Sequence, residues 1–402
     1  MVIAVVVTLV SAMFHFCGAA GLWDAKVSDW LNQRSSVTNK KIFIIGIDDK
    51  TLQQYGPVNT WSRDIPAKLI EILSADKSGG PAVIGLDVIY SEQTAAEADG
   101  HFARACAEAG NVVAAAGFSF KEQPETDETG NVVYNPYHVD HTLEPYPALR
   151  QHVTCGFVNT MVDADGYVRQ AMAYLDHEGE RVYSVSARIY KSYQESRGKE
   201  AVLPATYGGN NRYYFTYSGK PGGYSVVSMA DVLDGTVDAT LFRDAIVLVG
   251  AYAVGMQDAY TPAIAHNSQM YGVEIHANII EALLEKKTQL PVPPIFYGVA
   301  AGILCGLYFL AAFLPSRELK ILPATLLPLV LAALSVFGSR LLYQRGIIAP
   351  VILLPLSVSA IYLAQIVHGY LAELLRRRRV LNVFRQYVAP QVVDKISRDK
   401  DF

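Results

Sequence analysis

The sequence predicts a mixed α/β domain, with a largely parallel sheet and an antiparallel insertion, joined to four transmembrane α-helices. Three observations predict this class. Short, continuously apolar runs alternate with stretches of helical periodicity up to residue 290, a pattern typical of a parallel sheet covered by helices. Four longer apolar runs lie outside that alternating region. Four consecutive arginines, Arg376 to Arg379, follow the last of these runs.

The three later apolar runs have the length of membrane-spanning helices. They occupy residues 295–314, 321–339 and 346–367, and contain 20, 19 and 22 residues without a charge. A helix of about 20 residues is about 30 Å long, which matches the hydrocarbon core of a bilayer. None shows the polar stripe of a core helix. We therefore predict transmembrane helices at residues 295–314, 321–339 and 346–370.

A fourth apolar run opens the chain at residues 1–23 and predicts the first transmembrane helix. The alternative is a cleavable signal peptide, because small residues at 18–21 could form a cleavage site. The run is long for the apolar part of a signal peptide and lacks a basic start. These features favour the transmembrane helix.

Basic residues predict the orientation in the membrane. Arg376 to Arg379 lie two crossings away from Arg317 and Lys320, so the positive-inside rule places both groups in the cytoplasm. Residues 24–290 would then form an extracytoplasmic domain, and residues 371–402 a cytoplasmic helix. This arrangement predicts a multi-pass protein of a bacterial inner membrane, with the lipid bilayer as its first partner.

The charge distribution agrees with that topology. Formal net charge is −11 for residues 1–290 and +7 for residues 291–402. A basic internal tail suits an anionic inner leaflet. Because neither half shows a basic face, we expect no nucleic-acid partner.

Several elements of the 24–290 domain follow from the pattern of apolar residues. Polar and Pro-rich residues 121–147 predict a long loop, and the Asp-Gly pair at 165–166 predicts a tight turn in an antiparallel insertion. The predicted strands are 42–47, 82–87, 111–117 and 245–250, with an irregular strand at 207–217. The predicted helices are 63–75, 102–109 and 272–287.

Carboxylates at strand ends are the first candidates for a site. Asp48 and Asp87 follow two apolar strands, and open parallel sheets bind ligands at that edge. Capping of loops or helices is the alternative role. Asp163 and Asp165 could start a calcium loop, but a structural turn is favoured because the other ligands of an EF-hand are missing. His276 lies within an apolar helix, where packing or capping is the ordinary role.

The chain carries no recognisable catalytic motif, such as a nucleophile elbow, a phosphate-binding loop or a zinc-binding His pair. We predict no catalytic, cofactor-binding or metal-binding residue within it. Cys106 and Cys155 both lie in the external domain, where a disulfide is allowed, and two free buried thiols are the alternative.

Four segments of the chain are similar to one known family. They are residues 45–52 with the W-S-R-D of 61–64, residues 84–90, residues 156–169, and residues 249–278. They resemble the CHASE2 family, extracytoplasmic sensor domains of bacterial receptors with one membrane helix before and three after. The resemblance implies an unidentified external ligand and offers these sensor candidates: Asp48, Trp61, Arg63, Asp87, Asp165, Arg169, Asp258, His276 and Asn278.

The last stretch of the chain implies an output. Residues 371–396 resemble the linker that precedes class III adenylate or guanylate cyclase domains. Leu374, Leu381 and Val388 are seven residues apart, with Phe384 between them, which indicates a dimer seam on a signal-transmitting helix. Two heptads are also compatible with a juxtamembrane helix that packs only on itself. The resemblance therefore implies a homodimer that controls cyclic AMP synthesis. Mg²⁺ and ATP would belong to a cyclase domain beyond residue 402.

Other outputs stay open. The chain could be a stand-alone membrane binding or scaffold protein, whose arginine-rich tail binds lipid or a partner. A histidine kinase or Ser/Thr kinase is also compatible with the family resemblance. A transporter is disfavoured, because the three later runs lack the charges that a coupled transport site usually needs.

Overall fold

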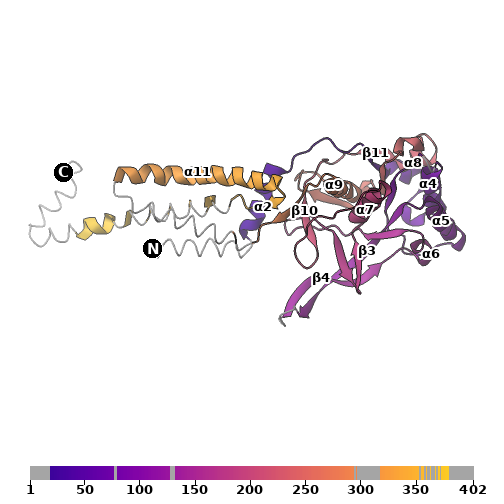
Figure 1. Ribbon diagram of the computed structural model, residues 1–402, viewed down its shortest axis with the longest axis horizontal. Helices are drawn as coiled ribbons and strands as arrows, with labels where there is room; N and C mark the ends of the chain where they lie inside the picture. The colour runs from indigo at the N-terminus through magenta and orange to yellow at the C-terminus, as the bar shows by residue number, and fades with distance from the viewer. Residues whose placement is uncertain are drawn as a thin grey trace, which may run out of the picture. The chain divides into compact units, whose positions relative to one another are not determined.

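The computed structural model describes residues 19–76, 79–126, 132–293, 296 and 317–352, and part of 355–379. The chain divides into two compact units. One unit comprises Ser28–Pro291 together with Leu342–Ile348, and the other comprises Met1–Val27, Val292–Leu341 and Ala349–Phe402. We refer to the first unit as the sensor unit, after the role that the family resemblance implies, and all strands described below belong to it (Figure 1).

Within the described residues, a seven-stranded sheet forms the centre of the sensor unit. Its strand order is β11-β1-β12-β2-β3-β4, with β5 also paired to β3. All neighbours are parallel except β3 and β4, so the predicted largely parallel sheet is confirmed. The strands are β1 Ile42–Ile47, β2 Val83–Asp87, β3 Val112–Thr126, β4 Val132–Leu143, β5 Thr154–Phe157, β11 Ser225–Ser228 and β12 Ile246–Ala251.

Helices cover both faces of this sheet, which explains why its strands are apolar throughout. One face packs against α4 Asp64–Ser74, α5 Ala96–Ala109, α6 Pro147–Arg150 and α8 Met229–Leu233. The other face packs against α7 Val185–Ser196 and α9 Gly272–Leu284. A short helix, α3 Asp49–Tyr55, follows β1 directly.

A second, smaller sheet covers the far side of α9. Its order is β16-β15-β10-β7, and β10 is antiparallel to both of its neighbours, as expected for the antiparallel insertion. Its strands are β7 Gln170–Met172, β10 Arg212–Phe215, β15 Thr288–Pro291 and β16 Ile347–Ile348. Shorter pairs involve β6 Tyr167–Val168, β8 Tyr174–His177, β9 Glu180–Tyr183, β13 Ala259–Pro262 and β14 Met270–Tyr271.

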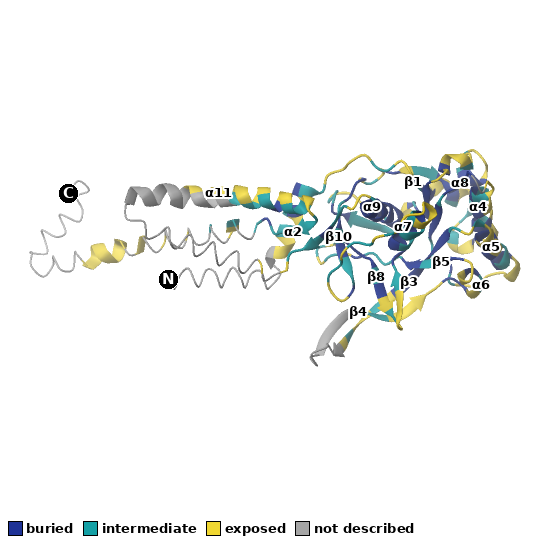
Figure 2. Ribbon diagram, viewed as in Figure 1, coloured by how far each residue is buried: buried dark blue, intermediate teal, exposed yellow. Residues whose placement is uncertain are grey.

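Helix α9 is therefore buried between two sheets (Figure 2). Val273, Ala277 and Ile280 pack toward the seven-stranded sheet. Ile275 and Ile279 pack toward the smaller sheet. Because α9 is covered on both sides, its polar residues Glu274, His276, Asn278 and Glu281 are buried as well.

Strand β16 comes from a segment far along the chain. It lies just after α11, Arg317–Gln344, and pairs in parallel with β15. The hydroxyl of Tyr343 lies 2.9 Å from Thr216 Oγ1 and accepts a hydrogen bond from Gln33 Nε2 at 3.2 Å. Gln33 directly follows α2, Ala19–Asn32. The start and the late segment of the chain thus meet within the sensor unit.

Two expectations from the sequence need correction or completion. The long loop predicted for residues 121–147 is wrong, because β3 and β4 form a long antiparallel hairpin there. Pro124 and many polar residues suggested a loop, but backbone pairing between two projecting strands tolerates both. The thiols of Cys106 and Cys155 are free, which matches the alternative to a disulfide.

In the part of the chain that the structure describes, no helix is both long and apolar enough to span a membrane. The predicted spans at 1–23 and 295–314 fall mostly outside the described residues, and the one at 346–370 is described only in part. The predicted span at 321–339 falls within α11, whose side chains are described only in part.

A histidine that bridges two acids makes the stability of the helical layer depend on pH. His101 on α5 contacts Asp64 through Nδ1 at 2.8 Å and Glu71 through Nε2 at 2.7 Å, both on α4. Hydrogen bonds to Asp64 and then Glu71 raise the pKa of His101. Its stabilising effect is therefore complete below the ordinary pKa of about 6.5. That effect is lost as the pH rises through the higher folded-state pKa.

We expect the urea midpoint of the wild-type chain to exceed that of His101→Gln at pH 5.5, and this gap to close toward pH 9. Urea unfolding of both proteins across that range measures it. A gap that does not change with pH would contradict the bridging role. The effect should be small, because the bridge is exposed to solvent.

Candidate ligand site at the carboxyl edge of the sheet

Three predicted site residues meet at the carboxyl edge of the seven-stranded sheet. Asp87 ends β2, Asp258 precedes β13, and His276 belongs to α9. His276 Nε2 lies 3.7 Å from Asp87 Oδ1. Gly250 of β12 is the register partner of Asp87, and a Cβ at this glycine would lie 2.9 Å from Val273 Cβ. The missing side chain thus lets α9 approach the strand ends.

Asp258 is held against the first residue of α9. The backbone nitrogen of Gly272 donates to the Asp258 carbonyl at 3.1 Å. A Cβ at Gly272 would overlap the Asp258 carboxylate, so a larger residue there would force this carboxylate to move. Gln257, just before Asp258, has a φ of 53° in the left-handed region. The backbone therefore turns sharply where the carboxylate is placed.

The carboxyls of Asp87 and Asp258 have few groups around them that could stabilise a negative charge. The Asp87 side chain is only 12% exposed, and its Oδ2 finds no hydrogen-bond partner among the described residues. Burial, and then the charge of Asp258, raise the pKa of Asp87 well above its ordinary value. Burial also raises the pKa of Asp258, against an opposing hydrogen bond from Tyr260. Carboxyl groups whose pKa is raised by burial and by a neighbouring charge are typical of functional sites.

His276 does not supply the missing positive charge. Burial lowers its pKa to about 4, so the imidazole is neutral near pH 7. Its Nδ1 lies 2.9 Å from Ser186 Oγ on α7. A serine, a histidine and an aspartate in a row resemble a nucleophilic triad, but 3.7 Å between His276 and Asp87 is too long for a hydrogen bond. The arrangement suits recognition of a ligand better than acyl transfer.

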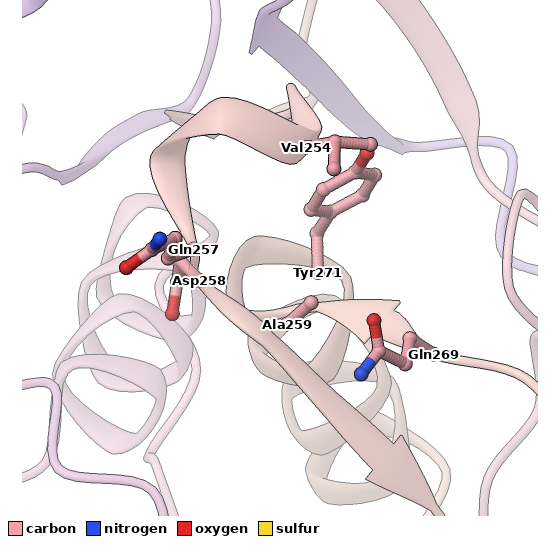
Figure 3. Close-up of a pocket in the computed structure, with 6 residues that line it drawn as sticks. All are labelled: Val254, Gln257, Asp258, Ala259, Gln269 and Tyr271. Carbon is pink, nitrogen blue, oxygen red and sulfur yellow. The ribbon is translucent and has the colours of Figure 1, made fainter.

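An open pocket of about 430 Å³ lies beside Asp258 (Figure 3). Figure 3 shows Gln257 and Asp258 on one side of Ala259, with Tyr271 and Gln269 on the other. The Tyr271 ring also packs against Tyr252, at 4.6 Å between centroids. The pocket has the size of a small-molecule site. Its lining residues are Val254, Gln257, Asp258, Ala259, Gln269 and Tyr271.

Asp165 and Arg169 belong to a separate ion cluster. Arg169 is 4% exposed and binds Asp165 with two nitrogens, at 2.7 and 2.8 Å. It also donates to Asp163 at 3.0 Å and to Asp29 at 2.9 Å. The predicted tight turn is confirmed, since Gly166 N donates to the Asp163 carbonyl. Within the described residues, no group of His, Cys, Asp or Glu side chains could hold a metal ion.

Asp48 and Asn278 bind backbone groups. Asp48 caps α3, accepting from Thr51 N at 2.9 Å, and it also accepts from the Ser228 hydroxyl at 2.8 Å. Although burial opposes it, these hydrogen bonds lower the pKa of Asp48. Asn278 accepts from the backbone nitrogens of Ser218 and Gly219. The structure therefore gives both residues capping roles away from the pocket.

Trp61 and Arg63 stabilise the entry to α4. Trp61 is buried, and its indole nitrogen donates to the Gly56 carbonyl at 2.8 Å. The Arg63 guanidinium lies 4.8 Å from the centre of the Tyr90 ring and donates to the Glu92 carbonyl.

Of the predicted signal-transmitting residues, Leu374 is exposed. Leu381, Phe384 and Val388 lie outside the described residues.

Sequence reasoning missed several residues around the site. Gln257, Gln269 and Tyr271 line the pocket, and Asp29 joins the Arg169 cluster. None of them stands in a recognisable motif. The one local signal for the pocket was the Gln257-Asp258 pair in the segment after an apolar strand.

An α/β domain with an open pocket at the carboxyl edge of a parallel sheet is the arrangement of small-molecule binding domains. Comparison with family models identifies which domain this is. The CHASE2 domain model matches residues 2–312, more than half of the chain, and the chain belongs to the CHASE2 family. CHASE2 domains are typically extracytoplasmic sensor domains. Comparisons with curated proteins and with solved structures give no match.

We expect Asp87→Asn to stabilise the chain at neutral and higher pH. Because the folded-state pKa of Asp87 is raised, the aspartate favours the fold below its ordinary pKa of about 3.9. This contribution is lost as the pH rises through the folded-state pKa. Asparagine removes the ionisation, with a gain on the order of 1 kcal/mol.

Urea unfolding at pH 4 and pH 8 measures this effect. Asp244→Asn is the matched control, since Asp244 is exposed and its φ of 56° suits asparagine. An Asp87→Asn chain that is less stable than wild type at pH 8 would refute the claim that ionisation of the buried Asp87 carboxyl destabilises the fold.

Proposed function

We propose that this chain is the sensor and membrane-spanning part of a receptor-type class III adenylate cyclase. The sensor unit binds an external molecule at the pocket beside Asp258. Transmembrane helices at 1–23, 295–314, 321–339 and 346–370 carry the change to a cytoplasmic output in a homodimer. Membership of the CHASE2 family supports the sensor role.

One observation carries the membrane topology. The segment Leu342–Ile348 lies between two apolar runs, and it contributes β16 to the sheet of the sensor unit. A segment that pairs with that sheet lies on the same side of the membrane as the sensor. Helix α11 has 28 residues and begins at Arg317. At 1.5 Å per residue it is about 42 Å long, enough to reach the opposite side.

The strand pairing supplies information that charge counting lacks. Arg317 and Lys320 stand at one end of α11, while Arg340 and Arg345 stand near the other. Equal numbers of basic residues at both ends leave the positive-inside rule without a preference for this helix. Pairing between β15 and β16 favours the orientation that the Arg376 to Arg379 cluster also indicates.

Three connections of the sensor unit could transmit a signal. Helix α2 begins within the first apolar run and is tied to the domain through Asp29 and Arg169. Strand β15 leads toward the second run, and β16 links the third run to the fourth. A ligand would act on the output only if it prefers one of two arrangements of these connections.

The nature of the output rests on the linker resemblance of residues 371–396, which favours a cyclase over a kinase. The cyclase domain, with its Mg²⁺ and ATP, would lie beyond residue 402. Class III catalytic sites form between two such domains, so the proposal includes a homodimer seam at Leu374, Leu381, Phe384 and Val388.

Cysteine labelling tests the topology. We expect a membrane-impermeant maleimide added outside intact cells to label Asp244→Cys and Gln344→Cys, and to leave Glu318→Cys and Glu373→Cys unlabelled. Asp244 and Gln344 are exposed positions of the sensor unit. Native cysteines are replaced first, and lysed cells serve as the positive control. Equal labelling of Gln344→Cys and Glu318→Cys in intact cells would rule out the proposed topology.

Cyclic AMP measurements test the output. In cells that express the complete gene, we expect Leu381→Pro to abolish the signal-dependent change in cyclic AMP. Proline costs about 3 kcal/mol in a helix interior and would interrupt the transmitting helix. Leu381→Met is the matched control and should preserve the response. If the complete gene yields no cyclic AMP, the cyclase assignment fails and a kinase or scaffold role takes its place.

A further inference from the structure

We infer that the pocket beside Asp258 binds a small organic cation with a primary ammonium group. The inference deepens the proposed sensor role, since it names the chemical class of the signal. Three observations support it: the carboxyls have no positively charged partner, the pocket walls suit an ammonium group, and the pocket has too few carboxylates to bind a metal ion.

The carboxyls Asp87 and Asp258 lack a positive partner. No Arg or Lys among the described residues is paired with either of them, and His276, the nearest basic side chain, is neutral. The same sensor unit neutralises another acidic cluster by burying Arg169 among three aspartates. Asp258 lines the pocket and Asp87 does not, although the charge of Asp258 acts on Asp87. A buried carboxyl without a cationic partner is costly. A cationic ligand beside Asp258 would lower that cost.

The walls of the pocket suit an ammonium group. Asp258 supplies a carboxylate, and Gln257 and Gln269 offer amide oxygens as further acceptors. The Tyr271 ring supplies an aromatic face, which attracts cations. Val254 is exposed at the rim and could contact a short aliphatic chain. No Lys or Arg lines the pocket within the described part of the chain, so no cationic side chain would attract an anion there.

A metal ion fits the pocket less well than an amine. Calcium takes six to eight oxygen ligands, several of them carboxylates. The described residues hold no group of three or more His, Cys, Asp or Glu side chains that could bind a metal together. Asp258 is the one carboxylate among the residues that line this pocket. An ammonium ion needs only one carboxylate and a few neutral acceptors.

Titration calorimetry on the full chain in lipid nanodiscs tests the inference. The probes are n-butylamine and 1,4-diaminobutane, with n-butanol and butyrate as neutral and anionic analogues of similar size. We expect the amines to bind and the analogues to show no binding. Asp258→Asn should weaken amine binding about tenfold or more, equivalent to about 1.4 kcal/mol.

Two further variants make the result decisive. Asp244→Asn removes an exposed carboxylate elsewhere and should leave amine affinity unchanged. Gln269→Lys places a cation at the exposed wall of the pocket, and should also abolish amine binding if Asp258→Asn does not fold. The readout is binding itself, so it does not depend on the cyclase or on the membrane topology.

Several outcomes would overturn the inference. Butyrate or butanol binding as tightly as butylamine would exclude recognition of the ammonium group. Calcium binding that EDTA reverses, without amine binding, would identify a metal site. Undiminished amine binding by both Asp258→Asn and Gln269→Lys would place the amine elsewhere, and an absence of binding by every probe would exclude this ligand class.

Discussion

The burial of α9 between two sheets is the constraint on which the rest of the sensor unit depends. A helix covered on both sides must satisfy every polar side chain that it carries within the protein. Glu274 accepts from Gly222 N, and Glu281 accepts from the Tyr224 hydroxyl and from Asn39 N. With Asn278, these side chains hold the irregular chain that precedes β11, and Glu281 also holds the segment before β1. The helix thus organises both a core and a loop that lacks regular pairing of its own.

The candidate site lies where a buried polar atom, Oδ2 of Asp87, has no hydrogen-bond partner among the described residues. His276 of α9 is hydrogen-bonded to Ser186 through Nδ1, while its Nε2 lies 3.7 Å from Asp87 Oδ1, too far for a hydrogen bond. The Arg169 cluster shows that the same sensor unit can neutralise buried aspartates with a buried guanidinium. The carboxyl edge of the sheet lacks such a partner among the described residues. The difference between the two clusters is the physical argument for a ligand at one of them and a structural role for the other.

The sequence predicted those parts of the fold that local patterns determine. Continuous apolar runs located β1, β2 and β12, and helical periodicity located α4 and α9. The β3–β4 hairpin was not predicted, because its strands are polar and contain Pro124. Neither composition nor periodicity distinguishes such strands from a loop. The residues of the candidate site were also predicted only in part. Motif resemblance named Asp87, Asp258 and His276, but it could not separate them from Asp48 and Asn278, because capping and ligand binding use the same residue types.

Long-range pairings were beyond any local reading, and β16 is the clearest case. Two isoleucines after α11 carry no strand signal, yet they complete a sheet with β15, more than 50 residues earlier. That pairing has a mechanical consequence. The pocket lies at the first residue of α9, and β15 begins a few residues after its last. Thirteen helical residues span about 20 Å. Because α9 is packed on all sides, we expect a ligand-dependent shift of its start to reach β15 and the β16 strand paired with it.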